Sequence, residues 1–198
     1  KDYSLPNASW SPDMVGLYNE LLEKTTAGSW RRLPSYLYSG QFLKNFKSVI
    51  RNSTLVRTTK NSSLRFLTKM VAEKEGHGFE YAIFHNPLEK KCICLFQPGP
   101  HLEGLPGIIH GGALGTMIDS TFFITAYRSA DAIFTGTMTI VFKSPVILGS
   151  VVRLEARVTG TEGRKVFLSC EAQNSDRTVL FAEASDCHIP LHPQEGMG

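Results

Sequence analysis

Residues 110–119 read His110-Gly111-Gly112-Ala113-Leu114-Gly115-Thr116-Met117-Ile118-Asp119. A histidine and two glycines begin an apolar run that carries one carboxylate. Glycines at the start of a helix let a ligand approach the backbone N–H groups, where the helix dipole favours negative charge. An oxyanion that develops during a reaction is such a charge. The pattern therefore predicts a helix whose first turn binds a reacting carbonyl oxygen.

The spacing between His110 and Asp119 indicates that the site is shared between two chains. Nine residues of helix correspond to roughly 13 Å of rise and about 900° of rotation, which is half a turn out of phase. Two residues placed so on one helix cannot act on the same carbonyl carbon. In a two-fold dimer, His110 of one subunit can meet Asp119 of the other. We therefore expect a homodimer with its site between the chains.

The composition is that of an ordinary globular protein. The chain has 198 residues, of which 42% are hydrophobic and 20% are charged, so it has enough apolar mass for a core. Its net charge of +3 is too small to indicate a nucleic-acid partner. The four cysteines show neither a Cys-x-x-Cys pair nor the spacing of a zinc site, and no apolar run approaches the roughly 20 residues of a membrane span. We expect no cofactor, no metal and no transmembrane segment.

The N-terminal third is expected to extend the main domain. Ser11-Pro12-Asp13 is typical of a helix start, with an N-cap, a proline at the first helical position and an acid in the first turn. Gly28 ends the helical pattern. From Trp30 to Ser63 the sequence indicates irregular structure with a short helix near residues 41–50. We place a helical and irregular extension at residues 1–63 and the second domain at residues 64–198.

The second domain alternates between strand-like and helical patterns. Segment 63–72 fits a strand or a short helix, and a Pro/Gly-rich loop at 98–107 is expected to have a defined shape near a ligand. Strands are predicted at Phe79–His85, Lys91–Phe96, Ala132–Lys143, Val151–Thr159, Arg164–Gln173 and Thr178–Ile189. The segment Gly112–Arg128 is apolar on most sides and is expected to be a buried helix. An α+β fold, with an antiparallel sheet wrapped around one central helix, satisfies this order.

This order, with His-Gly-Gly at the start of the buried helix and Asp nine residues on, resembles the hotdog-fold acyl-CoA thioesterases. Three further blocks resemble the mitochondrial subgroup formed by thioesterase superfamily members four and five. They are Lys1-Asp2-Tyr3-Ser4-Leu5-Pro6-Asn7, Gly28-Ser29-Trp30-Arg31-Arg32-Leu33-Pro34-Ser35-Tyr36 and Leu102-Glu103-Gly104-Leu105-Pro106-Gly107. The resemblance covers nearly the whole chain.

The resemblance implies an enzyme of lipid metabolism that hydrolyses medium- to long-chain fatty acyl-CoA to fatty acid and CoA. It also implies a homodimer, or a larger oligomer built from it. The implied location is the mitochondrion, with a leader already removed, and the cytoplasm is the second expected location. The preferred acyl chain length and any regulatory protein partner lie beyond what the sequence specifies.

The resemblance also implies roles for particular residues. The aspartate that matches Asp119 is the base or the nucleophile. The positions matching His110, Gly111 and Gly112 act on the thioester carbonyl, and the threonine matching Thr135 lies beside the aspartate and helps to place the water. Positions that contact the substrate or its CoA part match Val141, Lys143, Arg164 and Ser169.

The phosphates of CoA require fixed cations near the mouth of the site. Lys143 ends one predicted strand, and Arg164-Lys165 begin another after a glycine turn, so we expect the antiparallel order to bring these ends together. One departure from the family lies here. Its pattern Asn-x-x-Tyr/Phe-Lys/Arg-x-Pro reads Thr139-Ile140-Val141-Phe142-Lys143-Ser144-Pro145 in this chain. A contact from an Asn side chain would be lost, whereas a backbone contact would survive.

Two other functions stay open at this point. A non-catalytic acyl-CoA sensor or interaction module would use the same fold, and the presence of both His110 and Asp119 argues against it. A hotdog hydratase or dehydratase pairs an aspartate with a histidine a few residues later at one carbon, an order that this helix reverses. For a hydrolase, Asp119 as general base and Asp119 as nucleophile through an anhydride both remain possible.

Overall fold

The computed structural model describes residues 2–36, 66–67, 74–127 and 133–190. These ranges contain an antiparallel sheet with strand order β1-β2-β3-β5-β6-β7-β4. Its strands are β1 (Arg31–Leu33), β2 (Phe79–Asn86), β3 (Lys91–Pro98), β4 (Ile133–Phe142), β5 (Val152–Glu162), β6 (Lys165–Gln173) and β7 (Leu180–Pro190). The helices are α1 (Pro12–Ala27), the 3-10 helix η2 (Pro100–Leu102) and α4 (Gly111–Tyr127).

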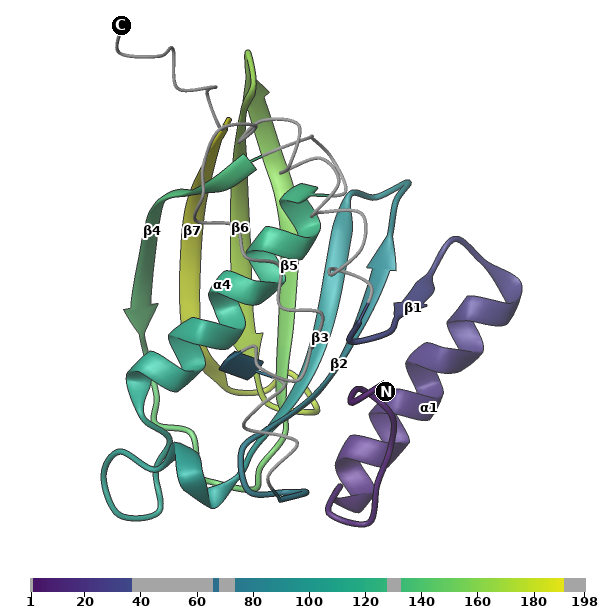
Figure 1. Cartoon of the computed structure of the whole chain (residues 1–198), viewed down its shortest axis with the longest axis vertical. Helices are drawn as coiled ribbons and strands as arrows, with labels where there is room; N and C mark the ends of the chain where they lie inside the picture. The colour runs from purple at the N-terminus through teal and green to yellow at the C-terminus, as the bar shows by residue number, and fades with distance from the viewer. Residues whose placement is uncertain (1, 37–65, 68–73, 128–132, 191–198) are drawn as a thin grey trace, which may run out of the picture.

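Helix α4 lies across one face of the sheet, which curves around it (Figure 1). Its apolar residues Leu114, Met117, Ile118 and Phe122 are at most 2% exposed, because the helix packs against strands β3 to β7. The predicted α+β arrangement, a sheet wrapped around one buried helix, is confirmed. In the described ranges, no helix is both long and apolar enough to cross a membrane.

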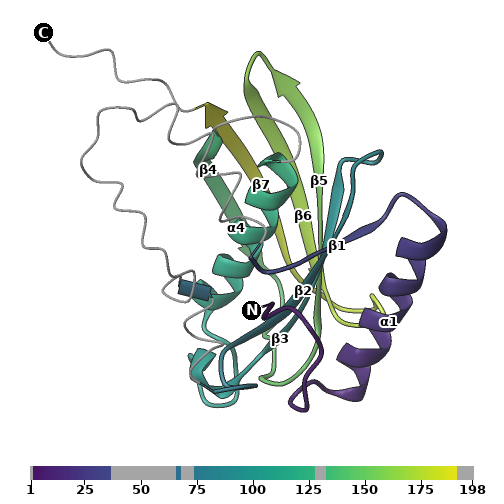
Figure 2. The same cartoon turned by 45° about the vertical axis from the view of Figure 1, so that its right-hand side comes forward.

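Helix α1 covers part of the opposite face of the sheet (Figure 2). Along β2, Tyr81 and Ile83 pack into the core around α4, whereas Ala82 and Phe84 pack into a second core with α1. Strand β3 divides its side chains in the same way. Strands buried on both faces read as nearly continuous apolar runs, which is the pattern that these two strands show.

The start of α1 is fixed by side-chain caps. The Ser11 hydroxyl accepts a hydrogen bond from the Met14 N–H at 3.2 Å, which confirms the predicted N-cap. The Ser11 N–H in turn donates to Gln97 Oε1 on β3 at 2.8 Å. Just before the helix, the Trp10 indole N–H donates to the buried Glu80 carboxylate at 2.8 Å. These bonds fasten the N-terminal segment to the sheet.

The expectation of irregular structure from Trp30 onward is wrong for residues 31–33. They form the short strand β1 on the edge of β2, with Arg31 opposite His85 and Leu33 opposite Ile83. Three residues are too few for a recognisable alternation, and this strand is specified by its tertiary partners. The short helix predicted near residues 41–50, and most of segment 63–72, lie outside the described residues.

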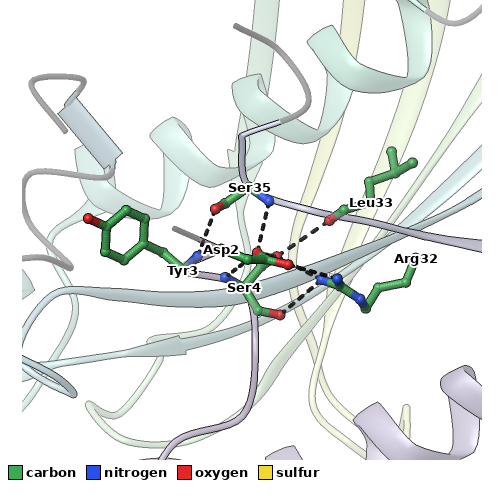
Figure 3. A network of polar contacts seen from close by, with 6 residues as sticks. All are labelled: Asp2, Tyr3, Ser4, Arg32, Leu33 and Ser35. Atoms are coloured by element: carbon green, nitrogen blue, oxygen red, sulfur yellow. Dashed lines mark hydrogen bonds and ion pairs between the residues drawn. The ribbon is translucent and has the colours of Figure 1, made fainter. Parts of the chain in front are cut away.

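The carboxylate of Asp2 joins the N-terminal segment to β1 and the residues after it (Figure 3). It accepts hydrogen bonds from the N–H groups of Ser4 and Ser35, both at 3.0 Å, and from the Ser4 hydroxyl at 2.8 Å. The Arg32 guanidinium donates to its other oxygen at 2.7 Å. Burial alone raises the pKa of Asp2, but these bonds outweigh burial and lower the pKa to about 2.

We expect Asp2→Asn to lower the free energy of unfolding by about 1–2 kcal/mol near pH 7, allowing for solvent screening. Because the folded-state pKa lies below the unfolded-state value, the stabilisation by Asp2 is present above about pH 4 and is lost as the pH falls toward 2. Urea unfolding at several pH values measures this dependence. The control Glu89→Gln removes the same charge at an exposed turn. An Asp2→Asn protein as stable as the control at pH 7 would contradict the assignment.

Candidate active site

The loop between β3 and α4 fixes the position of His110. The backbone N–H of Ile109 donates to the Val146 carbonyl at 2.9 Å, and that of His110 donates to the Leu102 carbonyl at 2.7 Å. Gly104 packs so closely that an added Cβ would lie 2.8 Å from the His110 Cα. Gly107 has a φ of +75°, a conformation that favours glycine, and its N–H donates to Glu103 Oε1 at 2.7 Å. The expected defined shape of this loop is therefore observed.

The side chain of His110 folds back onto the first turn of α4. The Gly112 N–H donates to His110 Nδ1 at 2.9 Å. Since Nδ1 accepts, the proton of a neutral ring lies on Nε2. Within the part of the chain that the structure describes, neither Nε2 nor the Gly111 N–H has an acceptor. The donors left at this helix end are thus Gly111 N–H and His110 Nε2–H, with Gly112 N–H holding the ring.

Asp119 lies two and a half turns further along α4, facing β4. The Thr135 hydroxyl donates to Asp119 Oδ1 at 2.8 Å, and both residues are half-buried. The structure thus places Thr135 beside Asp119, as predicted. Oδ1 is held by Thr135, whereas Oδ2 accepts no hydrogen bond from the described residues. His110 immediately precedes α4 and Asp119 lies within it, so a single chain keeps them roughly 13 Å apart along the helix axis.

Behind Thr135 lie two residues that the sequence reasoning missed. His188 Nε2 is 3.4 Å from Thr135 Oγ1, and His188 Nδ1 is 3.0 Å from Asp186 Oδ2. Both side chains are 0% exposed. A signal was present in the sequence, because Ala182, Ala184, Asp186 and His188 alternate along the core-facing side of β7. Polar residues at inward positions of a strand are exceptional and indicate a role.

The cations expected to bind CoA do not meet within one chain. Lys143 follows β4 at the end where Phe142 pairs with Ala182, and its Nζ lies 3.7 Å from Glu183. Arg164 and Lys165 lie at the opposite end of the sheet, beside the His188 end of β7. The separation is about eight residues of strand, or roughly 26 Å. The expectation that antiparallel order joins these ends is therefore wrong for the single chain.

The other two predicted substrate contacts point to the face of the sheet opposite α4. Val141 is 48% exposed on β4, one of the two edge strands, and it pairs with the outward-facing Glu183. Ser169 lies on β6 between Leu168 and Cys170, which are buried against α4, so its side chain points to the opposite face of the sheet.

An apolar groove begins at the first residue of α4. It has a volume of about 270 Å³ and runs between the helix start and the segment after β4. Its lining residues are Ile108, Ile109, Gly111, Leu114, Phe142, Lys143, Ser144, Pro145 and Val146. The groove therefore brings an apolar surface, one lysine and the Gly111 backbone together.

Three of the four cysteines are too deeply buried to act as nucleophiles. Cys92, Cys94 and Cys170 are fully buried in the core, and burial raises the pKa of Cys94 to about 12. Burial also raises the pKa of Cys170. A thiol that stays protonated is a poor nucleophile. On these elements, the candidate reactive groups are thus the carboxylate of Asp119 and the donors at the start of α4.

Comparison with known proteins identifies the class to which this fold and site belong. A family model described as "Thioesterase superfamily" matches residues 106–181, which include His110, Asp119 and Thr135. Two solved structures show the same fold. A crystal structure of a thioesterase superfamily protein has a TM-score of 0.52 at 14% identity, covering 56% of this chain and 53% of that one. The E. coli PaaI protein from the phenylacetic acid degradation operon has a TM-score of 0.50 at 17% identity, covering 53% and 75%.

Closer relatives match nearly the whole chain. Acyl-coenzyme A thioesterase THEM5 of Mus musculus is 40% identical over 195 residues, which cover 98% of this chain and 77% of the relative. Acyl-coenzyme A thioesterase THEM4 of Bos taurus is 41% identical over 196 residues, covering 98% and 81%. The chain therefore belongs to the thioesterase superfamily. The predicted hotdog fold, subgroup and enzyme class, a thioester hydrolase, are confirmed.

We expect Gly112→Ala to impair catalysis more than folding. The added Cβ would lie 3.0 Å from His110 Nδ1, so the ring must move and the helix-start donors change. Thiol release from a thioester is expected to fall by about tenfold or more, with Tm within about 2 °C of wild type because alanine favours the helix. The matched control is Gly16→Ala in α1, where the added Cβ has no neighbour within 4 Å. A Gly112→Ala protein that unfolds easily but keeps normal specific activity would contradict this account.

Proposed function

We propose that this chain hydrolyses medium- to long-chain fatty acyl-CoA to fatty acid and CoA, without a cofactor. The observation that carries the proposal is the Asp119–Thr135 contact of 2.8 Å on a buried helix. A carboxylate in such surroundings is costly unless it is hydrogen-bonded or has a function. Here one oxygen is hydrogen-bonded and the other is left to react. The THEM4 and THEM5 relatives named acyl-coenzyme A thioesterases support acyl-CoA as the substrate class.

Two chemical routes use Asp119 in the same geometry. As a general base, it takes a proton from water, and the water oxygen attacks the thioester carbon. As a nucleophile, it attacks that carbon directly and forms an anhydride that water then cleaves. In both routes the C–S bond breaks, CoA leaves as its thiol after protonation, and Thr135 holds the carboxylate in place.

The carbonyl oxygen becomes negative in either route and needs hydrogen-bond donors. The Gly111 N–H and His110 Nε2–H at the start of α4 are suitable donors, and the helix dipole adds positive potential there. Because Asp119 lies roughly 13 Å away on the same helix, we assign these donors to the second subunit of a homodimer. The Gly112 N–H, which holds the ring of His110, acts by orienting it.

Strand β4 is the proposed dimer contact. It forms one edge of the sheet, and three of its large apolar side chains are exposed: Phe134 (42%), Val141 (48%) and Phe142 (54%). An edge strand with exposed apolar residues is a surface that a second chain covers. A two-fold axis across β4 makes the two copies run antiparallel. Each Thr135 end then meets the partner's Lys143 end, where the partner's α4 begins.

The same dimer would bring predicted CoA contacts of one chain close to those of the other. Arg164 and Lys165 lie at the Thr135 end of the sheet in one chain. The partner's Lys143 and its apolar groove would reach that end, which provides cations for the phosphates and an apolar surface for the rest of the substrate. Val141 lies on the paired edge, and Ser169 lies on the outer face of β6 at the middle of that strand.

Location and regulation are proposed on the resemblance to members four and five alone. We place the protein in the mitochondrion and take the cytoplasm as the second location. A larger assembly of dimers, and a regulatory protein partner, are compatible with this proposal.

The test is CoA release from an octanoyl- to palmitoyl-CoA series, measured for wild type and Asp119→Asn. The substitution keeps the shape of the side chain and removes the base, so we expect kcat to fall by about 100-fold or more on every substrate. Glu89→Gln serves as the charge-matched control. Near-wild-type turnover by Asp119→Asn would refute the role of Asp119. Saturable acyl-CoA binding by a wild type that releases no CoA would support the sensor alternative instead.

A further inference from the structure

A buried pair of polar residues lies directly behind the proposed catalytic contact. Asp186 and His188 come from alternate positions of β7, and both side chains have 0% exposure. Their contact, from His188 Nδ1 to Asp186 Oδ2, measures 3.0 Å. The His188 ring also packs against Phe123 of α4, with the ring centroids 6.1 Å apart. The pair thus lies between the sheet and the helix that carries Asp119.

The surroundings provide few hydrogen bonds that would offset the free-energy cost of burying this pair. The neighbouring positions on β6 are Val166 and Leu168, both 2% exposed and apolar. Among the described residues, none donates an aligned hydrogen bond to either Asp186 oxygen, and the Nδ1–H direction of His188 lies off the line to Oδ2. Buried ionisable pairs with incomplete hydrogen bonding are costly, and apolar residues often replace them without loss of stability. A stabilising role does not account for the pair.

The direction of the Thr135 hydroxyl proton determines whether His188 Nε2 donates or accepts a hydrogen bond. Thr135 Oγ1 is 2.8 Å from Asp119 Oδ1 and 3.4 Å from His188 Nε2. An ionised carboxylate only accepts hydrogen bonds, so the Thr135 proton points to Asp119. The Thr135 oxygen then presents a lone pair to Nε2. This contact is attractive only if Nε2 carries a proton.

The same reasoning applies to the other nitrogen of the ring. At 3.0 Å, Nδ1 lies within ion-pair distance of Asp186 Oδ2, and the two atoms repel each other at this distance if neither holds a proton, although the Nδ1–H direction is off the line between them. The negative carboxylate therefore keeps a proton at this contact, while the second proton lies on Nε2.

We propose that Asp186 and His188 position the Thr135 hydroxyl, with His188 Nε2–H donating to Thr135 Oγ1 so that the Thr135 proton stays directed at Asp119. They are positioning residues, and neither contacts the substrate. The proposal rests on the proposed function, because it concerns how Asp119 is held during hydrolysis. Without the Nε2 proton, the ring accepts the Thr135 proton, and Asp119 Oδ1 loses its hydrogen bond.

A double-mutant cycle tests the coupling. We compare kcat and KM for acyl-CoA in wild type, His188→Phe, Thr135→Val and the double variant. Phenylalanine keeps a ring against Phe123, and valine keeps the shape of threonine. His188→Phe is expected to lower kcat by about fivefold to tenfold with little change in KM, and to cause no further loss in the Thr135→Val background. His188→Gln retains an N–H donor and should recover part of the loss. Ser185→Ala, an exposed position on β7, is the control.

Independent losses that multiply in the double variant, or wild-type kcat in His188→Phe, would overturn the proposal. A second measurement needs no turnover and uses only the folded wild-type protein. Imidazole nitrogen–proton NMR should show a proton on His188 Nε2 whose signal shifts in Thr135→Val. An unprotonated Nε2 near pH 7 would refute the proposal even if the variants fail to fold. Loss of CoA release in Asp119→Asn with an unprotonated Nε2 would leave the proposed function intact and reject the pair's role.

Discussion

The rigidity of α4 is the constraint on which the proposed chemistry depends. The helix runs without interruption from Gly111 to Tyr127, and it holds the donors at its start and the carboxylate of Asp119 roughly 13 Å apart. No rotation of a side chain closes that gap. A shared site between two copies closes it, and the antiparallel geometry of a β4–β4 edge contact brings opposite ends of the two helices together. The separation of the donors and Asp119 within one chain therefore supports a site that is shared between two chains.

Burial of the helix explains why Asp119 can be held so firmly. The sheet curves around α4, and the opposite face of β2 and β3 is covered by α1, so the strands behind the site have apolar partners on both sides. The N-terminal segment adds to this rigidity through Glu80 and Asp2, whose hydrogen bonds fasten it to the sheet. Behind Thr135 the core departs from this apolar rule at Asp186 and His188. We attribute this costly pair, which lies behind the Asp119–Thr135 contact, to the proposed chemistry rather than to packing.

Much of the fold could be predicted from periodicity, because long elements repeat their pattern several times. The buried helix, six strands and the Ser11 cap follow from apolar spacing and helix-start residues. Strand β1 could not be predicted, since three residues carry no periodic signal and their partner is β2. The opposite placement of Lys143 and Arg164 depends on strand order, which local sequence does not encode. Asp119 was singled out by the His-Gly-Gly-to-Asp motif and Thr135 by the family resemblance. Asp186 and His188 were missed because they lie in a strand whose alternating pattern shows nothing unusual.

The most direct test of the shared site is complementation between two inactive variants. Asp119→Asn and His110→Ala proteins are unfolded together, mixed in equal amounts and refolded, and CoA release from palmitoyl-CoA is measured. If each site takes Asp119 from one chain and His110 from the other, half of the dimers are mixed and each contains one intact site. The mixture should then recover about a quarter of wild-type turnover, well above either parent. A mixture no more active than its parents would contradict the shared site and place the whole chemistry within one chain.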